Sequence, residues 1–299
     1  MRFHQAVAFM ETDQLLDLCR ATDTLGYAGV YLSDHIFFPK QLKSRYTYSP
    51  HEDGSPIWAP ETNWPDCWCL ISAMAAITEH LEFTTGVYIA PARDLFTVAK
   101  SVGTAAYISH DRVRLGVGVG WCKEEFDATG QDFHNRGKRL DDMIPALRAL
   151  WSGGWVEYHG PFYDFDALQM NPTPEKQVPI YGGGHSEVAM RRAARLCDGW
   201  IGAGPYSEED GRHYLEQMKR YLADEGRSTD GFAIYMALAV MPEPDVYKRF
   251  EDLGMTDTIC APWMFTGAGG GVNTDARSDL DAKIAATEAF ATDVIAKTR

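Results

Sequence analysis

The segment Arg112-Val-Arg-Leu-Gly-Val-Gly-Val-Gly-Trp121 decides the fold class of this chain. Its first residues favour a β-strand, and glycines follow at alternate positions, 116, 118 and 120. Glycine packs poorly in a strand and costs conformational entropy, so this repetition indicates that something flat or bulky lies against the backbone where the strand ends. Comparable strand ends occur at Ser33-Asp34-His35, Thr85-Gly86-Val87 and Tyr181-Gly182-Gly183-Gly184-His185. Strand ends that converge on one ligand are typical of the parallel α/β barrel.

Strand and helix periodicities alternate along the whole chain. The expected strands are Phe3–Phe9, Ala28–Ser33, Leu81–Val87, Val113–Val119, Val178–Tyr181, Gly199–Ile201, Phe232–Val240 and Asp257–Ala261. The expected helices are Asp13–Leu25, Asp66–Thr78, Phe96–Ile108, Arg136–Leu150, Ser186–Leu196, Glu208–Glu225, Val246–Leu253 and Leu280–Ala296. Such crossovers make a parallel sheet, and eight units favour closure over an open doubly wound sheet. The sequence therefore predicts a (β/α)8 TIM barrel, as a single domain over residues 1–299.

Three segments exceed the minimal barrel. The long loop Phe37–Trp64 after the second strand is rich in Pro, Tyr, His and Trp, and loops of this length are usually functional. Ser152–Gln177 contains two short β-like runs, Trp155–Tyr158 and Phe162–Phe165, which predict a small hairpin insertion before the fifth strand. Gly267–Gly271 predicts a flexible loop after the eighth strand.

Composition narrows the functional classes. With 28 basic and 42 acidic residues, the formal charge of −14 argues against nucleic acid or an anionic membrane as a partner. No apolar segment predicts a signal peptide or a membrane span, and the six cysteines are scattered, so we expect a cytoplasmic protein with reduced thiols. No spaced Cys/His cluster, HExxH or GxSxG motif predicts a metal site or a serine hydrolase.

Two strand ends carry the first candidate site residues. Asp34 and His35 end the second strand, and one of them is expected to face the barrel mouth because successive side chains alternate between faces. Histidine exchanges protons near neutral pH, although a histidine that only caps a strand is an alternative. Gly183, Gly184, His185 and Ser186 lead into a helix, whose free N–H groups and dipole favour an anion; the alternative is a tight turn.

Charged residues near the glycine-rich strand leave two interpretations open. Glu124 and Glu125 either hydrogen-bond a ring nitrogen or substrate hydroxyl, or stabilise the first turn of a short helix. Lys138 lies in the cationic run Phe133–Arg139, which either helps to bind phosphate or forms a solvated helix face.

These residues resemble the luciferase-like monooxygenase superfamily, in its branch that depends on the deazaflavin coenzyme F420. The resemblance covers roughly residues 1–205. The matching segments are Leu25-Gly-Tyr-Ala-Gly-Val-Tyr-Leu-Ser-Asp-His35, Gly86-Val-Tyr-Ile-Ala-Pro-Ala-Arg93, Leu115-Gly-Val-Gly-Val-Gly-Trp-Cys-Lys-Glu-Glu-Phe126, Arg136-Gly-Lys-Arg-Leu-Asp-Asp142, Gly160-Pro-Phe-Tyr-Asp-Phe165 and Pro179-Ile-Tyr-Gly-Gly-Gly184 through Asp198-Gly-Trp200.

The resemblance implies a deazaflavin ring at the carboxyl-terminal mouth of the barrel. A non-proline cis peptide, here Gly86–Val87, would form a bulge behind the ring, and Gly118 and Gly120 would let the ring approach the backbone. Asp34 would bond the ring edge and His35 would exchange the proton, with Glu124 or Glu125 approaching from the same side. Further implied contacts are those of Gly183, Gly184, His185, Ser186 and Lys138 with the cofactor phosphate.

The implied activity is hydride transfer between F420 and a small organic substrate. Tyr46, Tyr48, Trp58 and Trp64 of the long loop indicate a flat or apolar substrate, or alternatively loop packing. Trp121 stands where some deazaflavin dehydrogenases have an acidic residue, which argues against a sugar-phosphate dehydrogenase. The alternatives are an FMN-dependent two-component monooxygenase, in which Glu-His-His is more usual than Asp34-His35-Ile36, and a non-catalytic flavin-binding protein. Family members commonly form homodimers, which we expect here.

Overall fold

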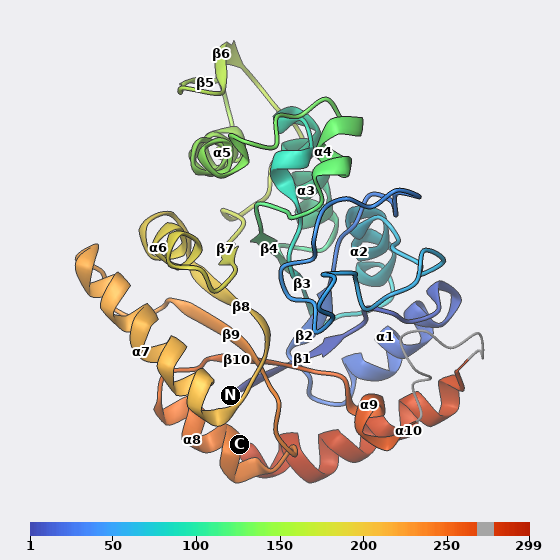
Figure 1. The fold of residues 1–299 in the computed structure, drawn as a ribbon. Helices are drawn as coiled ribbons and strands as arrows, with labels where there is room; N and C mark the ends of the chain where they lie inside the picture. Colours follow the sequence, from blue (N-terminus) through green and yellow to red (C-terminus); the bar gives the residue numbers. More distant parts are fainter. Residues whose placement is uncertain (268–277) are drawn as a thin grey trace.

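The computed structural model describes residues 1–267 and 278–299, and it confirms the predicted (β/α)8 barrel. Eight parallel strands close in the order β1-β10-β9-β8-β7-β4-β3-β2 (Figure 1). They are β1 Arg2–Ala6, β2 Gly29–Leu32, β3 Glu82–Thr85, β4 Val113–Val117, β7 Ile180–Gly183, β8 Gly199–Tyr206, β9 Ala233–Leu238 and β10 Asp257–Cys260. Because β1 pairs with both β2 and β10, the ring of strands has no open edge.

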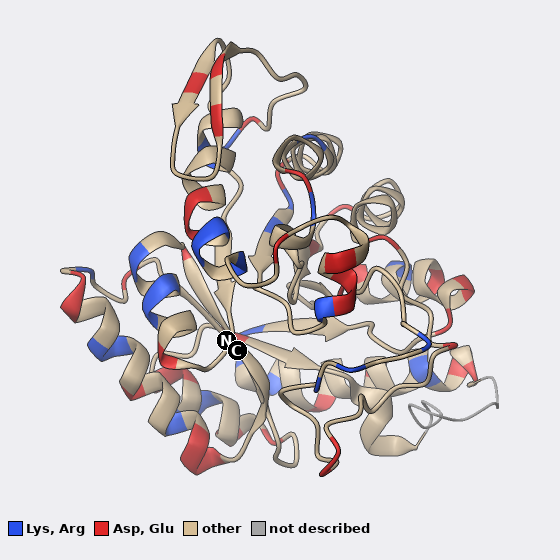
Figure 2. Ribbon diagram, turned by 45° about the horizontal axis from the view of Figure 1, so that its top comes forward, with Lys and Arg blue, Asp and Glu red and all other residues tan. Residues whose placement is uncertain are grey.

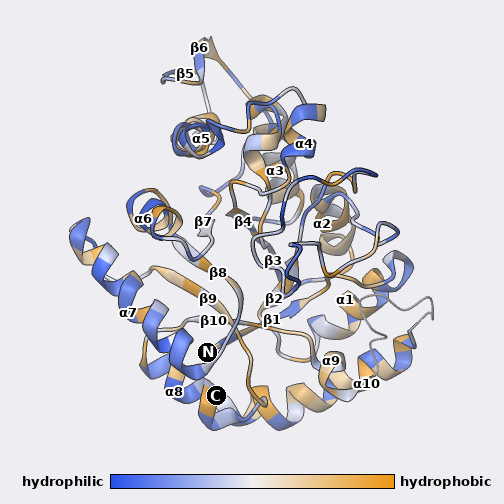
Figure 3. Ribbon diagram, viewed as in Figure 1, coloured by the Kyte–Doolittle hydropathy of each residue, from blue (hydrophilic) through white to orange (hydrophobic). Residues whose placement is uncertain are grey.

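Helices surround the barrel and turn their apolar residues toward it. They are α1 Leu15–Asp23, α2 Cys67–Ala75, α3 Leu95–Ile108, α4 Lys123–Ala128, α5 Arg136–Leu150, α6 Glu187–Leu196, α7 Glu208–Asp224, α8 Pro244–Asp252, α9 Pro262–Thr266, α10 Leu280–Phe290 and α11 Ala296–Thr298, with short turns η1 Thr12–Gln14, η2 Ala90–Ala92 and η3 Ala291–Ile295. In α7, Leu215, Met218 and Leu222 are buried at helical spacing beneath a hydrophilic outer face (Figure 3).

The outer surface mixes both signs of charge. Figure 2 shows acidic and basic residues interspersed along the outer helices. Among the described residues, no helix has both the length and the apolar character that a membrane span requires.

The predicted hairpin insertion is confirmed, and some strand ends differ from the prediction. β5 (Val156–His159) and β6 (Asp164–Leu168) pair antiparallel and extend beyond α5 (Figure 1). β1 ends at Ala6 instead of Phe9, because Phe9 adopts a φ of 65° and the chain turns there. β8 is longer than predicted because, after an irregularity, Pro205 and Tyr206 pair again with β9. The predicted flexible loop Gly267–Gly271 lies, beyond Gly267, outside the described residues.

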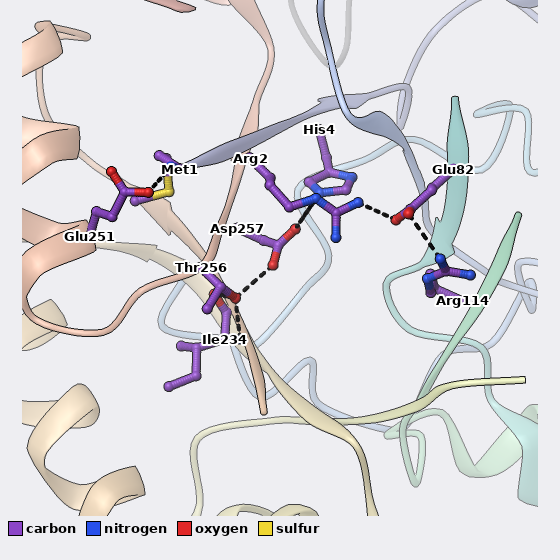
Figure 4. Close-up of polar contacts among 9 residues, drawn as sticks. All are labelled: Met1, Arg2, His4, Glu82, Arg114, Ile234, Glu251, Thr256 and Asp257. Atoms are coloured by element: carbon purple, nitrogen blue, oxygen red, sulfur yellow. Dashed lines mark hydrogen bonds and ion pairs between the residues drawn. The ribbon is translucent and has the colours of Figure 1, made fainter. Parts of the chain in front are cut away.

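Ion pairs close the amino-terminal end of the barrel (Figure 4). Asp257 of β10 bonds His4 Nε2 of β1 at 2.6 Å, and Glu82 of β3 bonds Arg114 Nη2 of β4 at 2.9 Å. Arg2 connects the two pairs through contacts with both Glu82 and Asp257. Buried carboxylates are tolerated when cations and hydrogen bonds compensate them, so these side chains tie four strand starts together. The opposite end of the barrel carries the candidate site.

Candidate active site

A cavity of about 560 Å³ lies at the carboxyl ends of the barrel strands. Segments that follow β1, β2, β3, β4 and β7 line it, together with residues of β8. Of the predicted site residues, the lining includes Asp34, His35, Gly86, Val87, Gly118, Gly120, Gly183, Gly184, His185 and Ser186. The structure therefore brings together most of the strand ends that the sequence singled out. Glu124, Glu125 and Lys138 are not part of the lining.

Val87 occupies a space that two glycines leave open. The peptide bond Gly86–Val87 is cis, as the family resemblance implies. A Cβ added to Gly118 would lie 2.4 Å from Val87 Cγ2, and one added to Gly183 would lie 2.3 Å from Val87 Cγ1. The bulky group where a Gly118 Cβ would lie is therefore the chain's own valine, and the ring contact implied for Gly118 stays a prediction. Val87 in turn lines the cavity.

Gly120 has a similar explanation. Its φ of +78° lies in the left-handed region that favours glycine, and an added Cβ would lie 2.6 Å from Ile89 Cγ2. The glycines thus let the segment after β3 pack tightly against the end of β4. That segment forms part of the cavity wall.

Asp34 is held by three donors. Arg93 Nη1 and Nη2 each donate to one carboxylate oxygen at 2.8 Å, and the Ile89 N–H donates at 3.0 Å. Burial raises the pKa of Asp34, and the paired Arg93 opposes that rise. Asp34 therefore fixes the segment after β3, and its oxygens are already engaged where the resemblance implied a contact with a ring edge.

His35 is paired with a buried carboxylate. Its Nδ1 lies 3.2 Å from Glu125 Oε1, and the same oxygen accepts the Ile36 N–H at 2.7 Å. The side chain of Glu125 is 1% exposed and that of His35 is 12% exposed. Glu125 thus contacts the cavity only through His35. A carboxylate in this place favours the tautomer with a proton on Nδ1, which leaves Nε2 for exchange.

The first-turn interpretation of the two glutamates is confirmed, with a further role for each. Both lie in the first turn of α4. Glu124 Oε1 accepts the N–H groups of Lys43 and Ser44 at 2.7 and 3.1 Å, so it anchors the long loop and does not approach the cavity. Although burial favours the neutral acid, hydrogen bonds from Ser44 and Lys43 lower the pKa of Glu124 to about 2.

Lys138 is exposed on α5 and does not line the cavity, so the structure gives its predicted phosphate contact no support and the contact stays a prediction. The helix turns its neighbour Arg139 inward and Lys138 toward solvent. The cation of this run that lines the cavity is Arg136. Its Nε donates to Gly120 O at 3.0 Å, and its guanidinium lies 3.7 Å from the centre of the Phe133 ring.

The start of α6 retains the features of an anion site. Ser186 is its N-cap, and Ser186 Oγ accepts the Ala189 N–H at 3.3 Å. Gly184 has a φ of +110°, and its carbonyl accepts Trp200 Nε1–H at 2.6 Å. Burial lowers the pKa of His185, so this side chain offers a hydrogen bond and not a full charge at neutral pH. The first N–H groups of a helix lack intrahelical partners and attract anions.

Six rings form a continuous surface on the cavity, which we call the aromatic wall. Its members are Phe9, His35, Tyr46, Trp58, Trp64 and Trp121, and all of them line the cavity. The loop residues Tyr46, Tyr48, Trp58 and Trp64 were expected near a substrate, and the structure places them all in the lining.

Some lining residues were not predicted. Phe9 is predicted to lie in a strand, and Arg45 carries no distinguishing pattern beyond its charge, whereas Arg136 belongs to the predicted cationic run. Arg93 belongs to a segment that matches the family and is not among the predicted site residues, yet it holds Asp34. The available signal was a positive residue six places after Val87 of the suspected cis peptide. Among the described residues, no cluster of His, Cys, Asp and Glu side chains suits a metal ion.

Comparisons with known proteins identify the family. The model of a family described as luciferase-like monooxygenase matches residues 3–249. The uncharacterized protein Rv0940c of Mycobacterium tuberculosis (strain ATCC 25618 / H37Rv) is 35% identical over 300 residues, which cover 99% of this chain and 100% of that protein. The F420-dependent glucose-6-phosphate dehydrogenase of Microbacterium testaceum (strain StLB037) is 28% identical over 240 residues, which cover 78% of this chain and 65% of that protein.

The fold also matches solved structures. The coenzyme F420-dependent tetrahydromethanopterin reductase from Methanopyrus kandleri superposes with a TM-score of 0.70 at 13% identity, covering 100% of this chain and 99% of that one. At this identity the likeness concerns the fold alone. The family model spans most of the chain and the 35% identical relative spans nearly all of it, so the chain belongs to the luciferase-like monooxygenase family.

Proposed function

We propose that this protein is an F420-dependent oxidoreductase that transfers a hydride between the deazaflavin and a small organic substrate. The observation that carries the proposal is His35, held by the buried Glu125 inside the cavity at the strand ends. Hydride transfer to a carbon atom requires a matching proton, and His35 is a proton carrier in reach of the cavity. Similarity to the F420-dependent glucose-6-phosphate dehydrogenase supports F420 as the cofactor. We do not transfer the substrate of that relative to this protein.

The cavity fits a flat cofactor with a phosphate. Its volume of about 560 Å³ falls within the range of small-molecule sites. The surface formed by Val87, Gly118 and Gly183 offers backbone and one isopropyl group, which suits a planar ring system. The N-terminus of α6 with Ser186 and His185 suits the phosphate.

When bound, the deazaflavin would supply a two-electron hydride donor or acceptor. Val87 would support one face of it and leave the other face to the substrate. His35 would give or take the proton at Nε2, while Glu125 would hold the imidazole by its Nδ1–H. The aromatic wall would exclude water from the reacting atoms and fix the orientation of the substrate.

An FMN-dependent monooxygenase is the second candidate, because the matching family is described as a monooxygenase family. It would use the same cavity and the same start of α6. The non-catalytic flavin-binding protein is a third possibility, in which changing His35 would alter no turnover.

A fluorescence titration of the purified protein with oxidised F420 and, separately, with FMN tests the proposal. We expect F420 to bind and FMN to bind much more weakly or not at all. A preference for FMN would move the protein to the monooxygenase reading, and binding of neither would overturn the cofactor assignment. Tight F420 binding, followed by no oxidation of the reduced cofactor with any hydride acceptor, would favour the non-catalytic reading.

A further inference from the structure

The aromatic wall is built from three separate parts of the chain. Phe9 follows β1, Trp121 follows β4, and Tyr46, Trp58 and Trp64 belong to the long loop after β2. Ring centroids lie 5.0 Å apart for His35 and Trp58, 5.1 Å for His35 and Trp64, and 5.8 Å for His35 and Trp121. The proton-exchanging imidazole is therefore embedded among three indole rings.

The rings contact one another edge to face or at a tilt. Trp58 and Trp64 are 5.5 Å apart at 74°, Tyr46 and Trp121 are 5.1 Å apart at 56°, and Phe9 and Trp64 are 5.4 Å apart at 74°. Because the rings pack against each other, they form a continuous surface. They are not separate rings arranged around a space for a single charged group. Such a surface gains most from a flat apolar partner, through area burial and stacked or edge contacts.

The charged groups near the aromatic wall include one ion pair and two arginines that donate to backbone carbonyls. Both oxygens of Asp34 are bonded to Arg93, and Arg136 is held by the carbonyls of Gly120 and Phe133. Arg45 is exposed at the rim and donates to Glu52 O. An anionic substrate at the aromatic wall would lose its hydration among the apolar rings and would approach the carboxylate of Glu125 behind His35.

One polar group of the aromatic wall lacks a partner. Trp64 lines the cavity, and its indole N–H is buried without an acceptor among the described residues. Buried donors are normally satisfied, and any acceptor oxygen, including that of a carbonyl group, would satisfy an indole N–H. A flat ligand that carries an acceptor oxygen would suit the apolar rings and this donor.

From the proposed function we infer that the second reactant is an uncharged, planar aryl or conjugated carbonyl compound that lies on the aromatic wall. In the reduction, the carbonyl carbon receives the hydride, the π electron pair of the C=O bond moves to oxygen, and the oxygen receives a proton from His35. The carbonyl compound gains two electrons and becomes an alcohol, and the reduced deazaflavin is oxidised. The reverse reaction oxidises the alcohol.

The test compares three aldehydes with the F420-loaded enzyme, by the return of the oxidised deazaflavin absorbance. They are 2-naphthaldehyde (planar and neutral), 6-formyl-2-naphthoate (planar and anionic) and cyclohexanecarbaldehyde (neutral and not planar). We expect kcat/KM for 2-naphthaldehyde to exceed the other two by roughly tenfold or more. If the anionic or the non-planar aldehyde is used equally well while F420 binds, the substrate class is overturned and the proposed function stands.

Variants locate the effect. Trp121→Leu and Tyr46→Leu should each raise KM for 2-naphthaldehyde by roughly three- to tenfold and leave the Kd of F420 within about twofold. Trp155→Leu is the matched control, because Trp155 is 75% exposed on the β5–β6 hairpin, outside the cavity, and should change neither value. Equal KM values in all three variants would overturn the inference.

A measurement without cofactor separates this inference from the proposed function. Calorimetric titration of the cofactor-free protein should show 2-naphthaldehyde binding that Tyr46→Leu weakens and Trp155→Leu does not. If F420 fails to bind but this pattern appears, the aromatic wall stands and the cofactor assignment falls. If 2-naphthaldehyde does not bind, or Tyr46→Leu leaves its binding unchanged, the aromatic wall is not the substrate surface.

Discussion

His35 Nδ1 and Glu125 Oε1 lie 3.2 Å apart, and they come from the ends of different strands, β2 and β4. The same carboxylate oxygen accepts the Ile36 N–H, so Glu125 holds both the ring and the backbone beside it. Glu125 is buried and does not line the cavity, whereas His35 does. A pair of this kind places one exchangeable proton at a defined position in a largely apolar surface, which is what hydride transfer to carbon requires.

Removal of the imidazole should reduce turnover and spare cofactor binding. We expect His35→Asn to lower kcat by roughly 10²- to 10⁴-fold, the usual contribution of a positioned acid or base. The Kd of F420 should stay within about threefold, because the proposed phosphate contacts at α6 do not involve His35. Stopped-flow measurement of hydride transfer checks the expected fall in turnover, and fluorescence titration checks the Kd of F420. Unchanged kcat would remove His35 from the chemistry.

The partner carboxylate acts on the substrate through His35, so its effect should be smaller. Glu125→Gln keeps an acceptor for the Ile36 N–H but removes the charge behind the imidazole. We expect kcat to fall by roughly tenfold or more with little change in KM. Residues that orient a functional histidine through a hydrogen bond commonly have effects of this size. A rise in KM with unchanged kcat would show that Glu125 shapes only the substrate surface.

Sequence patterns located the strand ends well and their contacts poorly. Asp34, His35, Gly183 and Ser186 all line the cavity, because carboxyl ends of parallel strands meet at one mouth whatever the details of packing. Which group each side chain touches depends on tertiary distances that spacing does not encode. Arg93 follows β3 and bonds Asp34, which follows β2. Sequence periodicity does not predict such a pair.

The glycines also show that sequence patterns do not identify which group a residue contacts. Alternate glycines at the end of β4 predict that something flat or bulky lies against the backbone, and at Gly118 that group is Val87. Sequence indicates that something lies close to such a backbone, and only packing shows whether it is a ligand or the chain itself. The cationic run shows a related limit, because its residues lie on both faces of α5 and Lys138 lies on the exposed face.

Close packing around Val87 predicts a compensating pair of substitutions. In Gly183→Ala the new Cβ would lie 2.3 Å from Val87 Cγ1, so we expect Val87 to be displaced into the cavity. The cost in the free energy of unfolding should be about 1–3 kcal/mol, as in other overpacked sites, and F420 affinity should fall. Adding Val87→Ala should recover most of the stability.

Gly204→Ala is the matched control for this pair. An added Cβ at Gly204 meets nothing within 4 Å, so neither stability nor F420 affinity should change much. Chemical denaturation and F420 titration of the single and double variants measure both effects. Additive losses in the double variant would show that Gly183 and Val87 do not share this space.

The two serine N-caps separate helix stability from phosphate binding. Ser186 caps α6 inside the cavity lining, whereas Ser207 caps α7 outside it, and each Oγ accepts a backbone N–H. Ser186→Ala and Ser207→Ala should each cost about 1 kcal/mol in the free energy of unfolding. Only Ser186→Ala should also weaken F420 binding.

Lys138→Ala completes that comparison, since Lys138 is exposed and away from the cavity. It should leave the Kd of F420 unchanged at ordinary ionic strength. Equal losses of affinity in the Ser186 and Ser207 variants would mean that the start of α6 does not hold the phosphate. A marked loss in Lys138→Ala would restore the lysine as a phosphate contact.

Glu124 predicts an acid-sensitive anchor for the loop that carries most of the aromatic wall. Its carboxylate accepts the N–H groups of Lys43 and Ser44, and these contacts lower its pKa from 4.5 to about 2 against the opposing effect of burial. A carboxyl group whose pKa is lowered by folding stabilises the folded state at pH values above its unfolded pKa. That stabilisation disappears as the pH falls from 4.5 toward about 2, because the unfolded chain takes up the proton first.

The stability difference between wild type and Glu124→Gln should therefore be largest near neutral pH and shrink below it. We expect a difference of less than about 1 kcal/mol at pH 7, since the site is partly open to solvent and the amide retains an acceptor oxygen. Glu11, whose pKa is also lowered to about 2, titrates in both proteins, so its contribution cancels in the difference. Asp127→Asn, which breaks an exposed pair with Lys123 on the same helix, is the control and should cost less than about 0.5 kcal/mol at pH 7. Denaturation curves at pH 7, 5 and 3 measure the difference. If it stays constant or grows as the pH falls, the contacts of Glu124 with the loop do not hold its carboxylate ionised, and the loop depends on other anchors.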